Sequence, residues 1–177
     1  MICVFCASST SIDPGHVELA AAVGTELARR GHRLVSGGGC VSMMGAVATA
    51  ARAGGAHTVG VIPRRLLDLE VADTDADELL VVDTMRQRKA EMDARADAFL
   101  VLPGGLGTLE EMFEVWTTRA LGMHTKPVVL LDPTGVFDRL WVVLAELAAA
   151  GFLRPTALDA VTLTRTPTAA FAALEGP

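Results

Sequence analysis

Short apolar runs alternate with helix-like segments along the whole chain, and this alternation limits the possible folds more than any other feature. The runs carry few polar residues, as strands buried on both faces of a sheet do. We expect strands at residues 2–5, 32–35, 58–62, 79–82, 98–102, 128–131 and 161–163, and helices at 14–30, 42–53, 85–96, 108–121 and 136–150. This order predicts an α/β fold, with a doubly wound, mostly parallel sheet and helices on both of its faces.

The first helix has clear start and stop signals. Asp13 is a preferred N-cap residue, Pro14 suits the first helical position, and Gly31 is a common C-terminal stop. The segment 63–77 breaks the alternation with acidic, irregular sequence, and we expect a loop near the functional edge of the sheet. No linker or repeat divides the chain, which predicts one domain over residues 1–177.

The composition excludes several classes of protein. The chain has 177 residues, of which 51% are hydrophobic, so it is long enough to bury one core. Its net charge of -6 argues against a surface that neutralises nucleic-acid phosphates or docks on an anionic membrane. No apolar run approaches the ~18 residues of a membrane-spanning helix, and the N-terminus lacks the basic region of a signal peptide. We expect a cytoplasmic protein with no nucleic-acid or membrane partner.

The placement of cysteine and histidine predicts neither a disulfide within the first strand nor a bound metal. Cys3 and Cys6 are three residues apart in that strand, so their side chains point to opposite faces. Cys40 lies in a glycine-rich turn. The 4 histidines are scattered, and no cluster of Cys, His, Asp or Glu has metal-ligand spacing. No metal is expected.

Three turns that follow strands are the candidate binding segments, because open parallel sheets bind ligands at the carboxyl ends of their strands. They are residues 6–9, 36–45 and 103–111. The first lacks the glycines of a dinucleotide fingerprint, and no lysine precedes Ser42 or Thr108, as a Walker A loop requires. Both glycine-rich turns still present backbone N–H groups at helix N-termini, which suits a single phosphate. The alternative is a pair of tight turns that need only the positive φ of glycine.

The third turn leads into a helix with a polar face. Thr108 and Glu111 have the spacing of a capping box, in which each side chain binds a backbone N–H near the other residue. A core stripe follows at helical spacing, formed by Leu109, Met112, Phe113 and Trp116. Because this stripe faces the core, the side chains on the other face of the helix point toward a cleft or solvent, namely Glu110, Glu111, Glu114 and Thr117.

The preceding helix carries a cation on its apolar side. Arg88 shares a face with Met85 and Met92, whereas Arg86 lies on the outer side. A buried guanidinium needs a partner, so Arg88 either serves a functional site or snorkels toward a structural carboxylate.

These motifs together resemble the LOG (Lonely Guy) family of cytokinin riboside 5'-monophosphate phosphoribohydrolases, many of which were once labelled lysine decarboxylases. The most specific motif is PGGxGTxxE at residues 103–111, and the second is Met-x-x-Arg-Lys at residues 85–89. Supporting stretches are residues 37–39 with 44–45, 59–63 and 121–124. The resemblance spans most of the chain.

The resemblance implies a homodimeric, Rossmann-like enzyme that needs no cofactor. Its substrate is a nucleoside 5'-monophosphate, whose N-glycosidic bond is hydrolysed to free base and ribose 5-phosphate. Arg88 and Glu111 are implied to be the catalytic pair. The phosphate is implied to lie against Gly105, Leu106, Gly107 and Thr108. Further implied substrate contacts are Glu70, Lys89, Gly104, Glu110, Thr117, Ser8, Gly38, Gly39 and Met85.

The chemistry of these residues is compatible with that reaction. An oxocarbenium-like ribosyl cation needs a nearby carboxylate, and Glu111 would stabilise it or activate water. Arg88 would orient Glu111 and the ribose, because a guanidinium with a pKa above ~12 is a poor proton donor. Adenine, an N6-isopentenyl-type adenine and another purine all remain open as the base.

Three departures from the family pattern bear on base preference and pocket shape. Arg86 stands where many members have His, Ser42 replaces a common Gly, and Ala7 replaces the Gly of the first turn. None of them removes a proposed catalytic group.

Two other functions compete with hydrolysis. One is a non-catalytic nucleotide-binding carrier or sensor, which release of free base from AMP would exclude. The other is a pyridoxal phosphate decarboxylase, which needs a Schiff-base lysine in a cofactor site. The chain offers only Lys89 and Lys126, and the sequence around neither indicates such a site.

Overall fold

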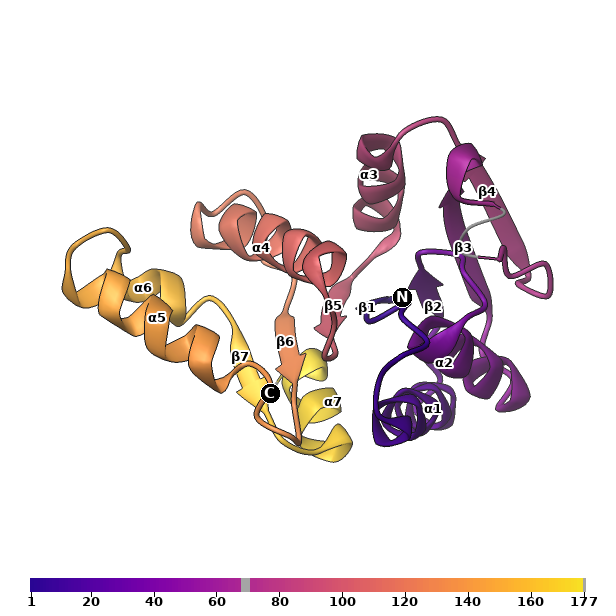
Figure 1. Cartoon of the computed structure of the whole chain (residues 1–177), viewed down its shortest axis with the longest axis horizontal. Helices are drawn as coiled ribbons and strands as arrows, with labels where there is room; N and C mark the ends of the chain where they lie inside the picture. Colours follow the sequence, from indigo (N-terminus) through magenta and orange to yellow (C-terminus); the bar gives the residue numbers. More distant parts are fainter. Residues whose placement is uncertain (68–70, 177) are drawn as a thin grey trace.

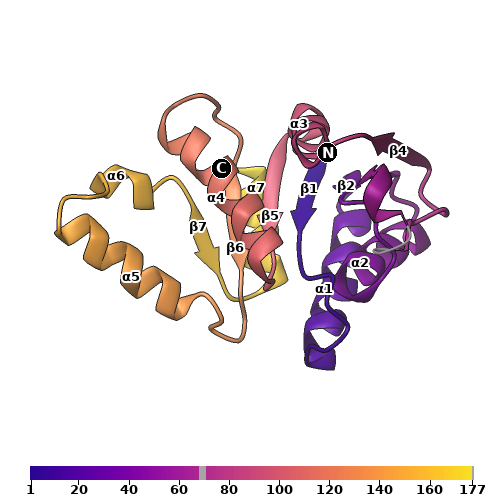
Figure 2. The same cartoon turned by 45° about the horizontal axis from the view of Figure 1, so that its top comes forward.

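A computed structural model describes residues 1–67 and 71–176. Seven strands form one sheet in the order β4-β3-β2-β1-β5-β6-β7, and each neighbouring pair is parallel. Figures 1 and 2 show helices on both faces of this sheet. The arrangement confirms the predicted doubly wound, Rossmann-like α/β fold.

The strands are β1 (Ile2–Phe5), β2 (Leu34–Ser36), β3 (Thr58–Pro63), β4 (Glu78–Val82), β5 (Ala98–Val101), β6 (Val128–Leu131) and β7 (Thr162–Thr164). The helices are α1 (Pro14–Arg29), α2 (Ser42–Ala53), α3 (Met85–Arg95), α4 (Leu106–Ala120), α5 (Asp138–Ala149), α6 (Pro155–Leu158) and α7 (Pro167–Glu175), with a 3-10 turn η1 (Arg64–Leu66).

Alternating strand residues divide the core into two apolar layers. In β1, Ile2 and Val4 pack in the layer that includes α1, α2 and α7. Cys3 and Phe5 point the other way, into the layer with α3, α4 and α5. Cys6 belongs to the first layer, so the predicted opposite orientation of Cys3 and Cys6 is confirmed, and both thiols are free.

The strand order reverses beside β1. The chain runs outward from β1 through β2 and β3 to β4, and then returns to place β5 on the other side of β1. Such a reversal opens a crevice above the carboxyl ends of the two central strands. The turn after β1 and the start of α4 both lie at this edge, so the topology brings two of the three candidate turns together.

The predicted start of α1 is confirmed, and the helix ends one residue before the predicted end. The Asp13 carboxylate accepts a hydrogen bond from the Gly15 N–H (2.8 Å), and Pro14 occupies the first helical position. Gly31 follows the helix with a φ of 74°. Local capping chemistry therefore defines this helix.

The predicted capping box in α4 is wrong. The helix begins at Leu106, two residues before the predicted start, and its N-cap is Gly105, which forms no side-chain cap hydrogen bond. Thr108 therefore lies within the first turn, buried against Gly104, where a Cβ would overlap its hydroxyl. The capping box occurs in α3 instead, where Thr84 and Gln87 bind each other's backbone N–H groups.

The sequence analysis missed helices α6 and α7. Thr166 caps α7 by accepting from the Ala169 N–H (3.2 Å), and Pro167 follows it. This is the same cap-then-proline signal that located α1, and Phe171 of α7 is fully buried in the first core layer. The expected loop at 63–77 contains η1, and its Ala72 forms an isolated antiparallel bridge with Gly39.

Within residues 1–67 and 71–176, no helix combines the length and the apolar character that a membrane crossing requires.

Replacement of Asp132 by Ala is expected to destabilise the fold by about 2–4 kcal/mol at pH 7. The Asp132 side chain is fully buried after β6 and accepts from the Phe137 N–H (2.7 Å) and the Thr134 hydroxyl (3.1 Å). Burial alone would raise its pKa, but these hydrogen bonds outweigh burial and hold the pKa below the ordinary value. The carboxylate therefore contributes stability above about pH 4, which is lost as the pH falls through the folded-state pKa.

Urea unfolding of wild type, Asp132→Ala and Asp132→Asn at pH 7 and pH 3 checks this expectation. Asn keeps one acceptor oxygen and should be the milder change. An unfolding free-energy difference between wild type and Asp132→Ala that is the same at both pH values would contradict the role of the ionised carboxylate.

Candidate active site

A cavity of about 240 Å³ lies at the carboxyl ends of β1 and β5, where the strand order reverses. Its wall comes from the end of β1 with the turn at residues 6–9, the glycine turn at Gly37, Met44 of α2, helix α3 and the start of α4. These parts are far apart in the sequence, and Figure 1 shows α3 and α4 on neighbouring sides of β5. The topology therefore builds a single site from separate turns.

The N-terminus of α4 forms one side of the cavity. Gly105, Leu106, Gly107 and Thr108 all line it. Because Gly105 gives the helix no side-chain cap, the first backbone N–H groups of α4 are available to a ligand. The helix dipole adds a partial positive charge at this end, which favours an anion such as phosphate.

Arg88 enters the cavity from the inner side of α3. Its side chain is only 4% exposed, and its Nη2 donates a hydrogen bond to the Gly37 carbonyl oxygen (2.9 Å). A Cβ on Gly37 would overlap the guanidinium, so glycine is required for this close approach. Arg86, two residues earlier in α3, is exposed, which confirms the predicted separation of the two arginines.

Glu111 lies one turn into α4, half-buried, and lines the same cavity as Arg88. Both side chains are engaged in polar or electrostatic interactions. The Glu111 charge also acts at the end of β1. Burial raises the pKa of the Cys6 thiol most, and the Glu111 charge raises it further. At Cys3, the Arg88 charge partly offsets the same two effects. The site thus combines a carboxylate and a guanidinium in a partly desolvated crevice.

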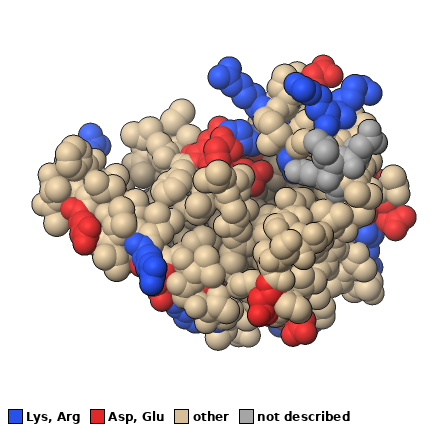
Figure 3. All heavy atoms as spheres, viewed as in Figure 1, with Lys and Arg blue, Asp and Glu red and all other residues tan. Residues whose placement is uncertain are grey.

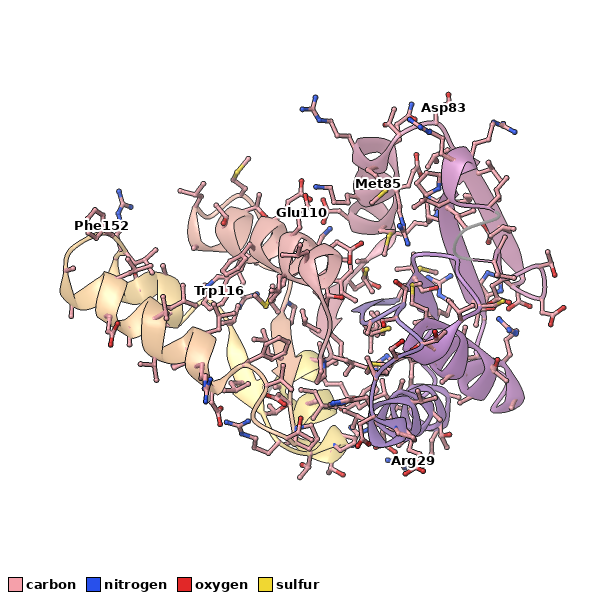
Figure 4. All side chains as sticks on the ribbon, in the orientation of Figure 1. Arg29, Asp83, Met85, Glu110, Trp116 and Phe152 are labelled. Atoms are coloured by element: carbon pink, nitrogen blue, oxygen red, sulfur yellow. The ribbon has the colours of Figure 1, made fainter. Side chains whose placement is uncertain are left out.

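Lys89 and Glu110 face each other rather than this cavity. The Lys89 ammonium pairs with Glu110 and, at 2.8 Å, with Glu114, so it ties α3 to α4. Figure 3 shows acidic side chains gathered beside a cation on this face of the molecule, and Figure 4 shows Glu110 on the part of α4 near α3. A second cavity of about 410 Å³ lies beside Lys89, and Glu111 lines it as well. Glu111 therefore separates the two cavities.

Four more of the expected substrate contacts do not line this cavity, namely Gly38, Gly39, Gly104 and Thr117. Gly38 accepts a hydrogen bond from the Asp73 N–H (2.8 Å), and Gly39 bridges to Ala72, so both hold the neighbouring segment in place. Thr117 is exposed and lines a different cavity, with Trp116. Glu70 lies outside the described residues. Gly104 packs against Thr108 beneath the cavity wall.

Ser8 and Met85 do line the cavity, as expected. Other lining residues were not named as substrate contacts from the sequence, among them Ala7, Ser9, Met44 and Met92, although Ala7 was singled out as a departure that bears on pocket shape. Ala7 and Ser9 lie in the turn at residues 6–9. The sequence analysis had already named this turn as a candidate binding segment, because it follows a strand. The two methionines have only the signal of an apolar helix face, which core residues share.

The family is decided by comparison with known proteins. Residues 44–174 match the profile of a family described as possible lysine decarboxylase. A cytokinin riboside 5'-monophosphate phosphoribohydrolase of Mycobacterium tuberculosis is 55% identical over 161 residues, covering 89% of this chain and 84% of the relative. One of Arabidopsis thaliana is 46% identical over 156 residues, covering 88% of this chain and 72% of the relative. The chain belongs to the LOG family.

Solved structures with the same fold extend beyond close LOG relatives. The molybdenum cofactor carrier protein of Chlamydomonas reinhardtii has a TM-score of 0.74 at 19% identity, covering 98% of this chain and 94% of that one. A molybdenum cofactor binding protein of Rippkaea orientalis has a TM-score of 0.71 at 22% identity, covering 94% and 90%. At these identities the likeness shows the fold alone.

The lysines of this LOG-family chain do not fit the decarboxylase description. A Schiff-base lysine must lose its proton. Burial would lower the pKa of Lys89, but its hydrogen bonds to Glu110 and Glu114 outweigh burial and raise it. Lys126 is held by the Asp93 carboxylate (2.8 Å) and the Asp93 carbonyl oxygen (2.7 Å), away from the cavity. Neither lysine is placed to hold pyridoxal phosphate.

Replacement of Arg88 by Ala is expected to lower kcat/KM for AMP by about 10- to 100-fold, which is the range of one charge-assisted hydrogen bond. Arg86→Ala should change it less than threefold, because that side chain is exposed. Steady-state kinetics of both variants checks this, with circular dichroism to confirm folding. Similar losses from the two substitutions would contradict the assignment of Arg88, and not Arg86, to the site.

Proposed function

We propose that this protein hydrolyses the N-glycosidic bond of nucleoside 5'-monophosphates, releasing the free base and ribose 5-phosphate. The observation that carries the proposal is that Glu111 shares one cavity with the open N-terminus of α4. Glu111 follows Thr108 by three residues, so its backbone lies about one helical turn, roughly 5 Å, beyond the N–H groups. A ribose 5-phosphate has a comparable span between its phosphate and the glycosidic carbon.

The phosphate would bind the backbone N–H groups of Gly105 to Thr108 and fix the sugar against Glu111. As the glycosidic bond breaks, positive charge develops at the sugar carbon, and the Glu111 carboxylate stabilises it or accepts a proton from water. The water oxygen bonds to that carbon, and one water proton ends on the departing base. Arg88, held by the Gly37 carbonyl, orients Glu111 and the ribose.

Two features of this chain support the mechanism. A guanidinium presents several N–H donors to a carboxylate and is a poor proton donor, so Arg88 can hold Glu111 in place but does not serve as the acid. The Glu111 position is half-buried beside apolar β1, where a fixed charge acts more strongly than in water. The names of the LOG relatives add the expectation that cytokinin riboside 5'-monophosphates are among the substrates.

Chromatography of the products from a panel of 5'-monophosphates tests the proposal. The panel contains AMP, N6-isopentenyl-AMP, GMP and CMP. Release of free base from at least one purine nucleotide is expected. Nucleotides that bind but stay intact would instead indicate the carrier or sensor function.

We propose a homodimer in the cytosol as the working form. Apolar side chains around a cavity of about 280 Å³ between α4 and α6 support an interface, with Leu121 66% and Phe152 78% exposed. Free thiols at Cys3, Cys6 and Cys40 fit a reducing compartment. Sedimentation velocity measures the assembled mass directly, and a monomer at micromolar concentration would contradict the dimer.

A further inference from the structure

Ser42, the first residue of α2, has a left-handed backbone with a φ of 54°. In the described chain, Val71 is the one other non-glycine residue with a positive φ. L-residues are strained in this conformation, whereas glycine adopts it freely. Strain of this kind persists where the surrounding structure holds it, and such positions cluster at functional sites.

The Ser42 hydroxyl does not cap its own helix. The N-cap of α2 is Val41, and no side chain caps this end. The hydroxyl instead donates a hydrogen bond to the carbonyl oxygen of Ser9 (2.6 Å). Ser9 ends the turn that follows β1 and lines the 240 Å³ cavity, as do the neighbouring Ser8 and Ala7.

This hydrogen bond joins a well-packed helix to a turn whose first residues, Cys6 and Ala7, are buried and whose later residues are exposed. The residues after Ser42 anchor α2, since Met43 is fully buried and Met44 is 6% exposed. By contrast, Ser8, Ser9 and the residue that follows them are exposed. The Ser42 hydroxyl thus provides a hydrogen bond from another element to this exposed part of the turn.

We propose that Ser42 is a positioning residue, whose hydroxyl holds the turn at residues 6–9 in place as a wall of the nucleotide cavity. The proposal rests on the proposed function, because it assigns the held turn to substrate binding. The proposed phosphate site and Glu111 belong to α4, a different part of the cavity wall. A loosened first turn would therefore weaken substrate binding more than the chemical step.

Two substitutions separate the hydroxyl from the strain. Ser42→Ala removes the hydroxyl and keeps the strained Cβ, whereas Ser42→Gly removes both. Both should raise KM for AMP about three- to tenfold, the effect of one neutral hydrogen bond, with kcat within twofold of wild type. The melting temperature of Ser42→Gly should be no lower than that of Ser42→Ala, since relief of strain offsets the flexibility of glycine.

A matched control and a second readout complete the design. Thr25→Ala removes a hydroxyl that bonds the Ala21 carbonyl oxygen (3.0 Å) within α1, away from the cavity, and it should leave KM unchanged. Amide hydrogen exchange of residues 6–12, measured without nucleotide, should become about three- to tenfold faster in both Ser42 variants. This readout needs no catalysis, so it decides the role of Ser42 even if AMP is not a substrate.

The outcomes are distinct. Raised KM and faster exchange in both variants, regardless of which melts higher, support the positioning role. Wild-type KM and wild-type exchange in Ser42→Gly would overturn it. A KM that follows the melting temperature across the two variants while residues 6–12 keep wild-type exchange would also overturn it, because stability alone would then explain the effect.

Discussion

Glu111→Gln is expected to lower kcat for AMP by about 100- to 1,000-fold and to leave nucleotide affinity within a few-fold of wild type. The amide keeps the size of the side chain and removes the charge that faces the developing ribosyl cation. The cap of α4 is Gly105 and involves no side chain, so the substitution leaves the start of the helix intact. Single-turnover kinetics and calorimetric AMP binding measure the two effects separately.

Glu114→Gln is the matched control for this prediction. Glu114 is on the same polar face one turn later, exposed, and paired with Lys89 (2.8 Å). Its loss of charge should change kcat less than threefold. Near-wild-type turnover in a folded Glu111→Gln variant would leave Glu111 with only a structural role.

AMP is expected to exceed adenosine in kcat/KM by about two to four orders of magnitude. Each backbone N–H bond to the charged phosphate is worth ~1.5–3 kcal/mol, so the loss of two removes roughly 3–6 kcal/mol. At ~1.4 kcal/mol per tenfold, this gives the stated range. Part of the effect should appear in kcat, because the bound phosphate positions the sugar against Glu111.

A second substrate pair provides the control for the phosphate prediction. N6-isopentenyl-AMP and its riboside differ from each other by the same phosphate, so they should show a similar ratio whatever the base contributes. Comparable kcat/KM values within either pair would mean that the N-terminus of α4 is not the phosphate site.

Local signals in the sequence predicted most of the fold. Apolar runs such as residues 128–131 matched their strand without error, because a fully buried strand leaves little ambiguity. The capping box at Thr108 failed because the same Thr-x-x-Glu pattern also fits the interior of a first turn. Helix α7 was missed although Thr166 and Pro167 carry the signal that located α1.

The site was predictable where it depends on one element and not where two elements meet. The inward side of α3 follows from helical spacing, so Arg88 could be placed from the sequence. The pairing of Lys89 with Glu110 depends on how α3 packs against α4, which no local pattern encodes. The hydrogen bond from Ser42 to Ser9 likewise spans two turns brought together only by the sheet.

The most direct test of the central claim is a product balance for AMP in water enriched in oxygen-18. Purified protein should release adenine and ribose 5-phosphate in equal amounts, with the label in the sugar, since the water oxygen bonds to the former glycosidic carbon. Glu111→Gln should slow both products together. Adenosine with labelled inorganic phosphate, or bound AMP that stays intact, would contradict the proposed hydrolysis.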